Sequence, residues 1–355
     1  MTSRVECVLI FVSLSKEQVD HESNFDVISK DILSLDQDDG VKALTSFEAM
    51  DYKYSKWVLL VSDMATKSVK DIADAIHQYI DNQKIKLDTY FNTLEQWNHC
   101  PRIAAFDMDS CLIKNECIDE MAVEMSVVEK VSEITRRAME GQYNFDQALM
   151  ERLALLKGMT LAQLEQVWTR IELNPGAYAM VQTLKHLGFK VALVSGGFTF
   201  FSHRVGARLG MDYVYSNQLE LVDGCMTGGI IGSILNGDMK LKILQELSTL
   251  NQCEQRDTLA MGDGSNDRYM VAYAHLGVAY HAKSVLKAST PFHINHTPLQ
   301  SVCFFLSKTL PLLTGPSSEI RSLLTELGMS PATIHDIKQE DELIRRYNND
   351  QPKLL

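Results

Sequence analysis

Two acidic clusters, far apart along the chain, contain the residues most able to do chemistry. Asp107 and Asp109 directly follow the apolar run 103–106, and Asp263 and Asp267 follow the run 258–261. Each cluster lies where a short buried strand should end, and open α/β sheets bind ligands beyond the carboxyl ends of their strands. Carboxylates gathered there are costly unless a cation neutralises them. The two clusters therefore predict a single Mg²⁺ site that serves phosphate chemistry.

Asp107 is the candidate nucleophile of this site. A carboxylate can attack phosphorus and form an aspartyl-phosphate, which divides one difficult displacement into two easier ones. Asp109 could protonate the leaving alkoxide and then accept a proton from the water that hydrolyses the intermediate. We expect Asp107, Asp263 and the backbone carbonyl of Asp109 to hold Mg²⁺, which proteins bind through few carboxylates together with water and phosphate oxygens.

Two further segments could contact a phosphate. Ser195-Gly196-Gly197 follows an apolar strand and offers one hydroxyl and exposed backbone N–H groups, which can surround phosphate oxygens. Lys240 lies at the start of a predicted helix and could neutralise the transferring phosphoryl group. Its neighbour Lys242 is expected to be exposed, as most lysines are.

The elements that position these residues alternate between strand and helix after Pro101. Strands are predicted over 102–106, 190–194, 258–261, 278–280 and 293–295, helices over 200–209, 239–247 and 267–274, and a hairpin around Asp223-Gly224. This alternation predicts a doubly wound, mainly parallel, Rossmann-like α/β sheet over residues 96–310. A helix-rich insertion, about 114–172, should cover the edge of that sheet as a cap.

The residues before and after this core form two other units. Residues 1–95 have the predicted order β-α-β-β-α-β, which indicates a small ferredoxin-like α+β domain. Its edge strand could pair two copies of the chain, so a homodimer is one expectation. Residues 311–355 are predicted to be a helical tail, with helices over 320–327 and 334–346 and no assigned role.

Composition excludes several classes of protein. The chain has 355 residues, 45% of them hydrophobic, and a formal charge of −12. Without a basic stripe, this charge argues against a nucleic-acid partner. No apolar run is long enough to cross a bilayer, and the first residues are predicted to form a strand rather than a signal peptide. The seven cysteines are scattered without a C-x-x-C pair, which favours reduced thiols in a cytoplasmic protein.

Four motifs, in their order and spacing, resemble those of the haloacid-dehalogenase superfamily. They are the cluster at Asp107 and Asp109, Ser195-Gly196-Gly197, Lys240, and the cluster at Asp263 and Asp267. The cap segments Asn115–Glu120, Ala138–Gly141, Asn144-Phe145 and Glu151–Leu153 narrow the resemblance to the phosphoserine phosphatases. The resemblance covers about residues 100–305, and residues 1–95 are similar to the small ACT-like, regulatory-type domains that precede many members. The resemblance to the phosphoserine phosphatases implies a Mg²⁺-dependent phosphoric monoester hydrolase. Such an enzyme converts O-phospho-L-serine to L-serine and phosphate, the last step of serine biosynthesis.

The resemblance also implies a role for each matched residue. Glu116 would receive the substrate ammonium, and Arg152 would pair with its carboxylate, as a guanidinium does bidentately. Met139 and Phe145 would close over the substrate. The matched phosphate contacts are Ser195, Gly196, Lys240 and Asn266, and Asp267 would support the lysine and the metal.

The sequence departs from the family at three positions and leaves other functions open. Cys111 stands where Thr is usual, Ser265 where Ala is usual, and Arg268 where an apolar residue is usual. A phosphotransferase that uses an alcohol as acceptor, a broad-specificity phosphomonoesterase, and a non-catalytic phosphate or amino-acid sensor are the alternatives. The complete set of catalytic residue types argues against the sensor.

Overall fold

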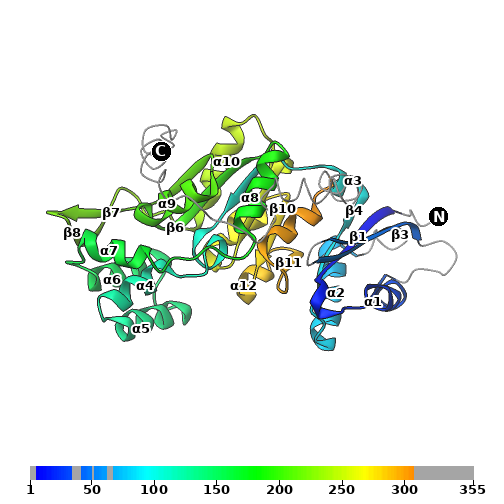
Figure 1. The fold of residues 1–355 in the computed structure, drawn as a ribbon, viewed down its shortest axis with the longest axis horizontal. Coiled ribbons are helices and arrows are strands. Elements are labelled where there is room, and N and C mark those ends of the chain that lie inside the picture. Colours follow the sequence, from blue (N-terminus) through cyan, green and yellow to red (C-terminus); the bar gives the residue numbers. More distant parts are fainter. Residues whose placement is uncertain (1–4, 34–40, 50–51, 62–66, 308–355) are drawn as a thin grey trace.

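The computed structural model describes residues 5–33, 41–49, 52–61 and 67–307. The predicted tail, 311–355, lies outside these residues. In the part described, the strands form one sheet of eleven strands in the order β2-β3-β1-β4-β11-β10-β9-β5-β6-β7-β8. Figure 1 shows the N-terminal elements at one end of the molecule and the cap helices at the other, with the core between them.

The N-terminal elements have the predicted ferredoxin-like order. They are β1 (Val5–Leu14), α1 (His21–Val27) with a π-helical turn (Ile28–Ile32), β2 (Val41–Ala49), β3 (Tyr52–Val61), α2 (Val69–Gln83) and β4 (Asp88–Thr93). Local chemistry sets the helix starts, because Asp20 accepts backbone N–H bonds at α1 and Ser68 and Asp71 form a capping box at α2. Helix α1 begins directly after the Asp20 cap.

The strands of the core are mainly parallel, as predicted. They are β5 (Ile103–Phe106), β6 (Lys190–Phe198), β7 (Tyr213–Val222), β8 (Cys225–Ile231), β9 (Thr258–Gly262), β10 (Leu276–Tyr280) and β11 (Phe292–Ile294). The pairs β11–β10, β10–β9, β9–β5, β5–β6 and β6–β7 are parallel. Strands β7 and β8 form the predicted hairpin, whose turn residues Asp223 and Gly224 both have positive φ, as a type I′ turn requires.

Helices cover both faces of this sheet, which makes it doubly wound. Ala104 and Phe106 of β5 pack into the cluster that contains α8 (Ala177–His186) and α9 (Thr199–Leu209). The alternate residues Ile103 and Ala105 pack with α10 (Gly237–Leu250) and α11 (Arg268–Tyr273). Helix α8 was not predicted from the sequence.

The cap consists of four helices inserted after β5. They are α4 (Cys117–Glu124), α5 (Val128–Met139), α6 (Phe145–Leu155) and α7 (Leu161–Trp168). Capping boxes at Asn144 and Thr160 begin α6 and α7. The cap contacts the core side directly, because the Asn236 amide donates to Asp146 Oδ1 at 3.1 Å.

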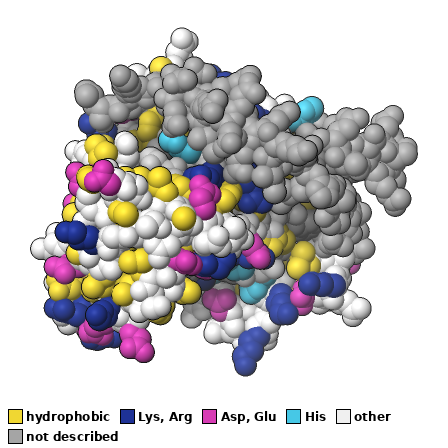
Figure 2. All heavy atoms as spheres, turned by 60° about the vertical axis from the view of Figure 1, so that its left-hand side comes forward, with side chains coloured by type: hydrophobic (Ala, Val, Ile, Leu, Met, Phe, Trp, Pro, Cys, Tyr) yellow, Lys and Arg dark blue, Asp and Glu magenta, His cyan; other side chains and the backbone are white. Residues whose placement is uncertain are grey.

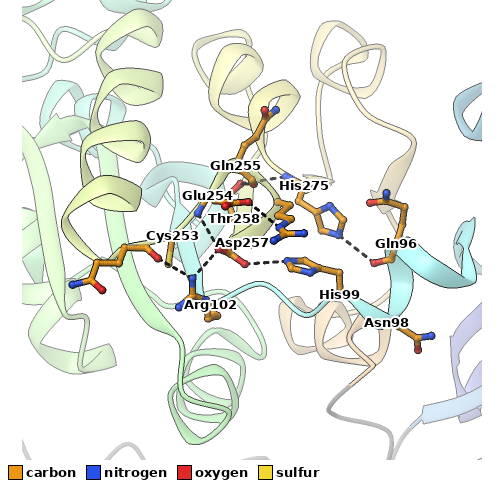
Figure 3. Close-up of polar contacts among 12 residues, drawn as sticks. Gln96, Asn98, His99, Arg102, Cys253, Glu254, Gln255, Asp257, Thr258 and His275 are labelled. Atoms are coloured by element: carbon orange, nitrogen blue, oxygen red, sulfur yellow. Dashed lines mark hydrogen bonds and ion pairs between the residues drawn. The ribbon is translucent and has the colours of Figure 1, made fainter.

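A polar cluster anchors the connection between the N-terminal elements and the core (Figure 3). This connection contains the short helix α3 (Leu94–Asn98). Asp257, just before β9, lies 3.0 Å from His99 Nε2 and 2.8 Å from Arg102 Nη2. The Arg102 guanidinium lowers the pKa of the Asp257 carboxyl to about 2, with help from the Glu254 N–H and His99, against the effect of burial. Asp257 therefore stays ionised and holds the part of the connection that lies between α3 and β5.

Surface features complete the description of the fold. Within the described ranges, none of the helices has the length and apolar character needed to span a membrane. Figure 2 shows acidic and basic side chains interspersed over the face it displays.

Candidate active site

Three neighbouring parallel strands bring the two acidic clusters together. Phe106 at the end of β5 is in register with Leu193 of β6 and Met261 of β9. Asp107 follows β5 directly, and its backbone N–H donates to the Met261 carbonyl at 3.0 Å. The carboxyl ends of β5, β6 and β9 therefore form one edge that contains Asp107, Ser195 and Asp263.

Lys240 is the buried cation of this edge. It lies in the first turn of α10, is fully buried, and places Nζ 2.7 Å from Asp107 Oδ1 and 2.7 Å from Asp267 Oδ1. Burial alone would lower the pKa of Lys240, but the two carboxylates more than offset burial and raise it. Lys240 is therefore a permanent positive charge shared by two acids.

The carboxylates outnumber this lysine. Carboxylate oxygens of Asp107, Asp263 and Asp267 lie within 4.8 Å of one another, and all three residues are buried. Burial and the neighbouring Asp267 raise the pKa of Asp107, and the same causes raise that of Asp263 to about 6. Asp267 is already occupied, because its Oδ2 accepts the N–H groups of residues 263 and 264 at 3.1 and 3.0 Å. An excess of buried negative charge with free carboxylate oxygens on Asp107 and Asp263 suits a hard divalent cation such as Mg²⁺.

Asp109 lies in the loop after Asp107, beside the base of the cap. Its Oδ1 accepts the Cys117 N–H at 3.2 Å. Burial, reinforced by the nearby Glu116 carboxylate, raises the pKa of Asp109 to about 7. A carboxyl group with this pKa can both donate and accept a proton near neutral pH.

A cavity of about 440 Å³ lies between this edge and the cap. Glu116 and Asp119 line it together with Arg152 of α6, so both signs of charge face the same space. Burial lowers the pKa of Arg152, while Asp119, Glu116 and Asp109 act in the opposite direction. The Ser110 hydroxyl donates to Glu116 Oε1 at 2.8 Å and orients that carboxylate.

The loop at the end of β6 adds hydroxyl and backbone groups to the cavity. Ser195 is buried, and its Oγ accepts the Gly197 N–H at 2.9 Å. A Cβ on Gly196 would lie 2.9 Å from Cζ of the Phe145 ring. Glycine at this position therefore lets the cap aromatic approach the loop closely.

The structure brings the predicted site residues into one region, where most of them line the cavity and two are buried behind it. The cavity is lined by Asp107, Asp109, Glu116, Met139, Phe145, Arg152, Ser195, Gly196, Asp263 and Asn266. Lys240 and Asp267 lie buried behind it, whereas the Lys242 side chain is 53% exposed, as expected. Met139 lines the cavity and is still 77% exposed, so it has surface to lose if the cap covers a ligand.

The three unusual residues have different surroundings. Cys111 is fully buried, and burial together with Asp107 raises the pKa of its thiol. Ser265 lines the cavity. Arg268 is exposed and outside the cavity, and its guanidinium donates to the hydroxyl of Tyr269 at 2.7 Å.

Several supporting residues were missed from the sequence. Asn217 on β7 donates to the Gly196 carbonyl at 2.8 Å and accepts the Leu235 N–H at 2.7 Å, so it fixes the phosphate loop. Asn174 donates to the carbonyls of Cys111 and Ile113 at 2.7 and 3.0 Å and fixes the loop after Asp109. Lys283 lines the cavity with Nζ 3.6 Å from Asp263 Oδ2. A lone Asn or Lys has no sequence signal, since its partners are distant backbone or side-chain groups.

Comparison with known proteins identifies the class of this site. Residues 104–272 match the family model of haloacid dehalogenase-like hydrolases. A phosphoserine phosphatase from Archaeoglobus fulgidus is 42% identical over 205 residues, which are 58% of this chain and 60% of that protein. One from Idiomarina loihiensis is 42% identical over 204 residues, which are 58% of this chain and 93% of that protein.

Solved structures are similar over different extents. A haloacid-dehalogenase-family hydrolase from Salmonella enterica serovar Typhi, 26% identical, covers 85% of this chain and 99% of its own, with a TM-score of 0.73. A phosphoserine phosphatase structure described as a phospho-aspartyl intermediate analogue is 37% identical. It covers 59% of this chain and 100% of its own, with a TM-score of 0.56.

The fold and the site define a haloacid dehalogenase-like hydrolase with a helical cap. Within this class, the relatives of about 40% identity that the chain covers over most of their length are phosphoserine phosphatases. The chain belongs to the phosphoserine phosphatase family.

Proposed function

We propose that this chain hydrolyses O-phospho-L-serine to L-serine and phosphate through an aspartyl-phosphate on Asp107. The observation that supports this most directly is the single cavity shared by Asp107, Asp109 and Asp263 with Glu116 and Arg152. The first three suit phosphoryl transfer, and the last two suit the ammonium and carboxylate of an amino acid. The similar protein from Archaeoglobus fulgidus and a similar structure solved with bound substrate are both phosphoserine phosphatases.

The reaction divides into two displacements. Asp107 attacks phosphorus, the bond between phosphorus and the serine oxygen breaks, and Asp109 gives its proton to the leaving alkoxide. Water then attacks the aspartyl-phosphate and gives a proton to Asp109, and the bond between Asp107 and phosphorus breaks to release phosphate. Lys240 and the N–H groups near Ser195 and Gly196 stabilise the charge on the transferring group, and Asn266 contacts the same phosphate.

We assign Mg²⁺ to Asp107, Asp263 and the backbone carbonyl of Asp109, with Asp267 supporting the site. When bound, the ion would supply positive charge to the nucleophile and the phosphate. The buried excess of carboxylate supports this assignment. Removal of divalent cations with EDTA should abolish turnover, and Mg²⁺ should restore it.

Substrate choice follows from the cap. Arg152 pairs with the substrate carboxylate, while Glu116, joined by Asp119, receives the ammonium. Phe145 and Met139 cover the bound substrate and exclude water. A phosphate ester without an amino-acid group would contact only the core of the site.

The first experiment is phosphate release from O-phospho-L-serine, O-phospho-L-threonine and p-nitrophenyl phosphate, with Mg²⁺ and with EDTA. Fast, Mg²⁺-dependent release that is selective for phosphoserine supports the proposal. Release from the aryl phosphate alone would retain the chemistry and reject the substrate. A phosphorylated alcohol among the products, formed when an acceptor alcohol is added, would indicate a phosphotransferase.

The remaining proposals concern the whole chain. Residues 1–95 form an ACT-like regulatory or dimerising unit, residues 96–310 form the catalytic core with its cap, and the protein is cytoplasmic. Cys7, Cys111, Cys117, Cys225, Cys253 and Cys303 are free thiols, which agrees with a reducing compartment. Strand β2 ends the strand order on the N-terminal side, so it offers an edge for a homodimer. Light scattering of the full chain would test the dimer.

A further inference from the structure

A contact between two side chains joins the start of α6, in the cap, to the start of α10, in the core. The amide nitrogen of Asn236 donates to Asp146 and lies 3.1 Å from its Oδ1 and 3.3 Å from its Oδ2. Both residues are half-buried, and neither lines the catalytic cavity. In the part of the chain that the structure describes, α6 has no other side-chain hydrogen bond to the core.

Asn236 belongs to the support of the catalytic lysine. Its side-chain oxygen accepts the Met239 N–H at 3.2 Å and so caps α10. Its backbone carbonyl accepts the Lys240 N–H at 2.9 Å. The oxygen atoms of Asn236 thus hold the first turn of the lysine helix, while its amide nitrogen holds the cap.

The residues on either side of Asn236 contact both loops that would hold the phosphate. The Leu235 N–H donates to Asn217 at 2.7 Å, and the Asn217 amide donates to the Gly196 carbonyl at 2.8 Å. A Cβ on residue 237 would lie 3.0 Å from the carbonyl oxygen of Asn266, so the backbone packs directly on the last motif. The segment before α10 is therefore a fixed point among the phosphate-binding groups.

On the cap side, α6 carries two residues that line the catalytic cavity. Phe145 and Arg152 stand at positions i and i+7 of the helix, which is close to two turns, so they share the face that the cavity meets. A Cβ on Gly228 of β8 would lie 3.2 Å from the Leu153 carbonyl oxygen, so the far end of α6 packs tightly on the β7–β8 hairpin. The hydrogen bond of Asp146 holds the near end, and the two attachments together set the direction of the helix.

We propose that Asp146 is a positioning residue for the reaction assigned above. By accepting from Asn236, it fixes the cavity face of α6, with Phe145 and Arg152, relative to Lys240 and the phosphate-binding loops. The amino-acid end of the substrate is then held at a set distance from the nucleophile, which a reaction that depends on proximity requires. This role rests on the proposed function, whereas the contact between the two helices does not.

Exchange of the two side chains tests this role. Asn236→Asp keeps an oxygen that can cap α10, but it places two carboxylates at hydrogen-bond distance, where like charges repel. Adding Asp146→Asn to Asn236→Asp restores the hydrogen bond with donor and acceptor reversed. Asp146→Ala removes the acceptor without adding charge. Gln245→Glu, at an exposed position of the same α10, is the control for an added carboxylate.

The first readout is the preference for O-phospho-L-serine over p-nitrophenyl phosphate, taken as the ratio of their kcat/KM values. The aryl phosphate has no amino-acid group for Arg152 to hold, so its turnover reports on the core alone. Asn236→Asp and Asp146→Ala should each lower the preference at least about fivefold, mostly through KM for phosphoserine. The double variant should return to within about twofold of the wild type, and Gln245→Glu should equal it. An unchanged preference in both single variants, or a folded double variant that regains none of it, would overturn the proposal.

Hydrogen exchange of residues 145–155 in the full-length, Mg²⁺-free protein is the second readout, and it does not depend on activity. Exchange should be faster in Asn236→Asp and in Asp146→Ala than in the wild type, and it should return to the wild-type rate in the double variant. Unchanged exchange in both single variants would overturn the proposal. A wild type that shows this exchange pattern but does not hydrolyse phosphoserine would reject the proposed function and still support the placement of α6 by Asp146.

Discussion

At the scale of single residues, the site depends on one lysine that serves two acids. Lys240 has no contact with water, yet it remains charged because Asp107 and Asp267 both lie 2.7 Å from its Nζ. Asp107 is the acid with a free oxygen next to the cavity. Lys240 favours the ionised form of Asp107 and fixes the position of its carboxylate, whereas burial and Asp267 oppose ionisation. The arrangement therefore leaves an excess of buried negative charge that a divalent cation can relieve.

Asp107→Asn should abolish turnover without unfolding the protein. The amide has the same shape and can still accept from Lys240, but it cannot form the aspartyl-phosphate, so kcat should fall at least about 10³-fold. Burial raises the pKa of Asp107, which means that its charge destabilises the metal-free native state at pH 7. The Tm of the metal-free variant should therefore equal or exceed that of the wild type. More than about a hundredth of wild-type kcat would exclude Asp107 as the nucleophile.

Arg152→Ala should separate substrate recognition from chemistry. Loss of a charged hydrogen-bond partner should lower kcat/KM for O-phospho-L-serine by about 10- to 100-fold, and that for p-nitrophenyl phosphate far less. Lys157→Ala, an exposed lysine on the same part of the cap, is the matched control. Equal losses on the two substrates would contradict the role given to Arg152.

At the scale of elements, strand ends determine where the chemistry lies. A Cβ on Gly262, the last residue of β9, would lie 2.3 Å from Cγ of Asp267. No side chain can occupy that space unless Asp267 moves away from Lys240. The small residue at the end of the strand is therefore as necessary as the acids that follow it.

Gly262→Ala should disturb the site through this contact. We expect kcat/KM to fall at least about tenfold and the free energy of unfolding to fall by about 1–3 kcal/mol, the range for overpacking. Gly229→Ala is the control, because its added Cβ would meet the flexible end of Glu220 at 3.2 Å and the Thr227 hydroxyl at 3.4 Å, but no backbone atom. Unchanged activity in Gly262→Ala, measured beside that control, would show that Asp267 can move without cost.

Elements with a regular pattern were predictable, and contacts between distant segments were not. The apolar runs before Asp107, Ser195 and Asp263 gave the three parallel strands, and the Asp-Gly turn gave the hairpin. Helix α8 was missed because Pro175-Gly176 and mixed residues precede it without an N-cap side chain. Asn217 and Asn174 were missed because they stabilise loops through backbone groups, which leave no pattern in the sequence.

At the scale of the whole molecule, the two parts of the sheet are joined by very few backbone pairs. Strands β4 and β11 pair only at Thr89 and His293, and side chains supply the rest of the contact. Asp88 holds the backbone of residues 295 and 297, and His77 stacks on His293. The stability of this junction should therefore depend on the charge state of a few side chains.

The junction should weaken in acid because of His77. Burial lowers the pKa of His77 to about 3, and the nearby His293, Lys287 and Lys70 act in the same direction. Asp74, Asp81 and Asp88 line the same cavity as His77, between α2 and the segment that contains β11. Since the folded-state pKa lies below the ordinary value of about 6.5, the unfolded chain binds this proton first. The contribution of neutral His77 to stability is complete above about pH 6.5 and is lost progressively as the pH falls toward 3.

His77→Phe should remove this dependence and keep the ring stacked on His293. Asp88 is also buried, and burial raises its pKa, so its titration acts on stability in the opposite sense. Because Asp88 is present in both proteins, the difference between the wild type and His77→Phe isolates His77. Between pH 7.5 and pH 5, the Tm of the wild type should fall by more than the Tm of the variant. Each kcal/mol of unfolding free energy that the wild type loses through His77 should lower its Tm by about several degrees. Parallel Tm curves over this range would mean that His77 is already protonated or exposed in the folded protein, and that the junction does not depend on its neutral form.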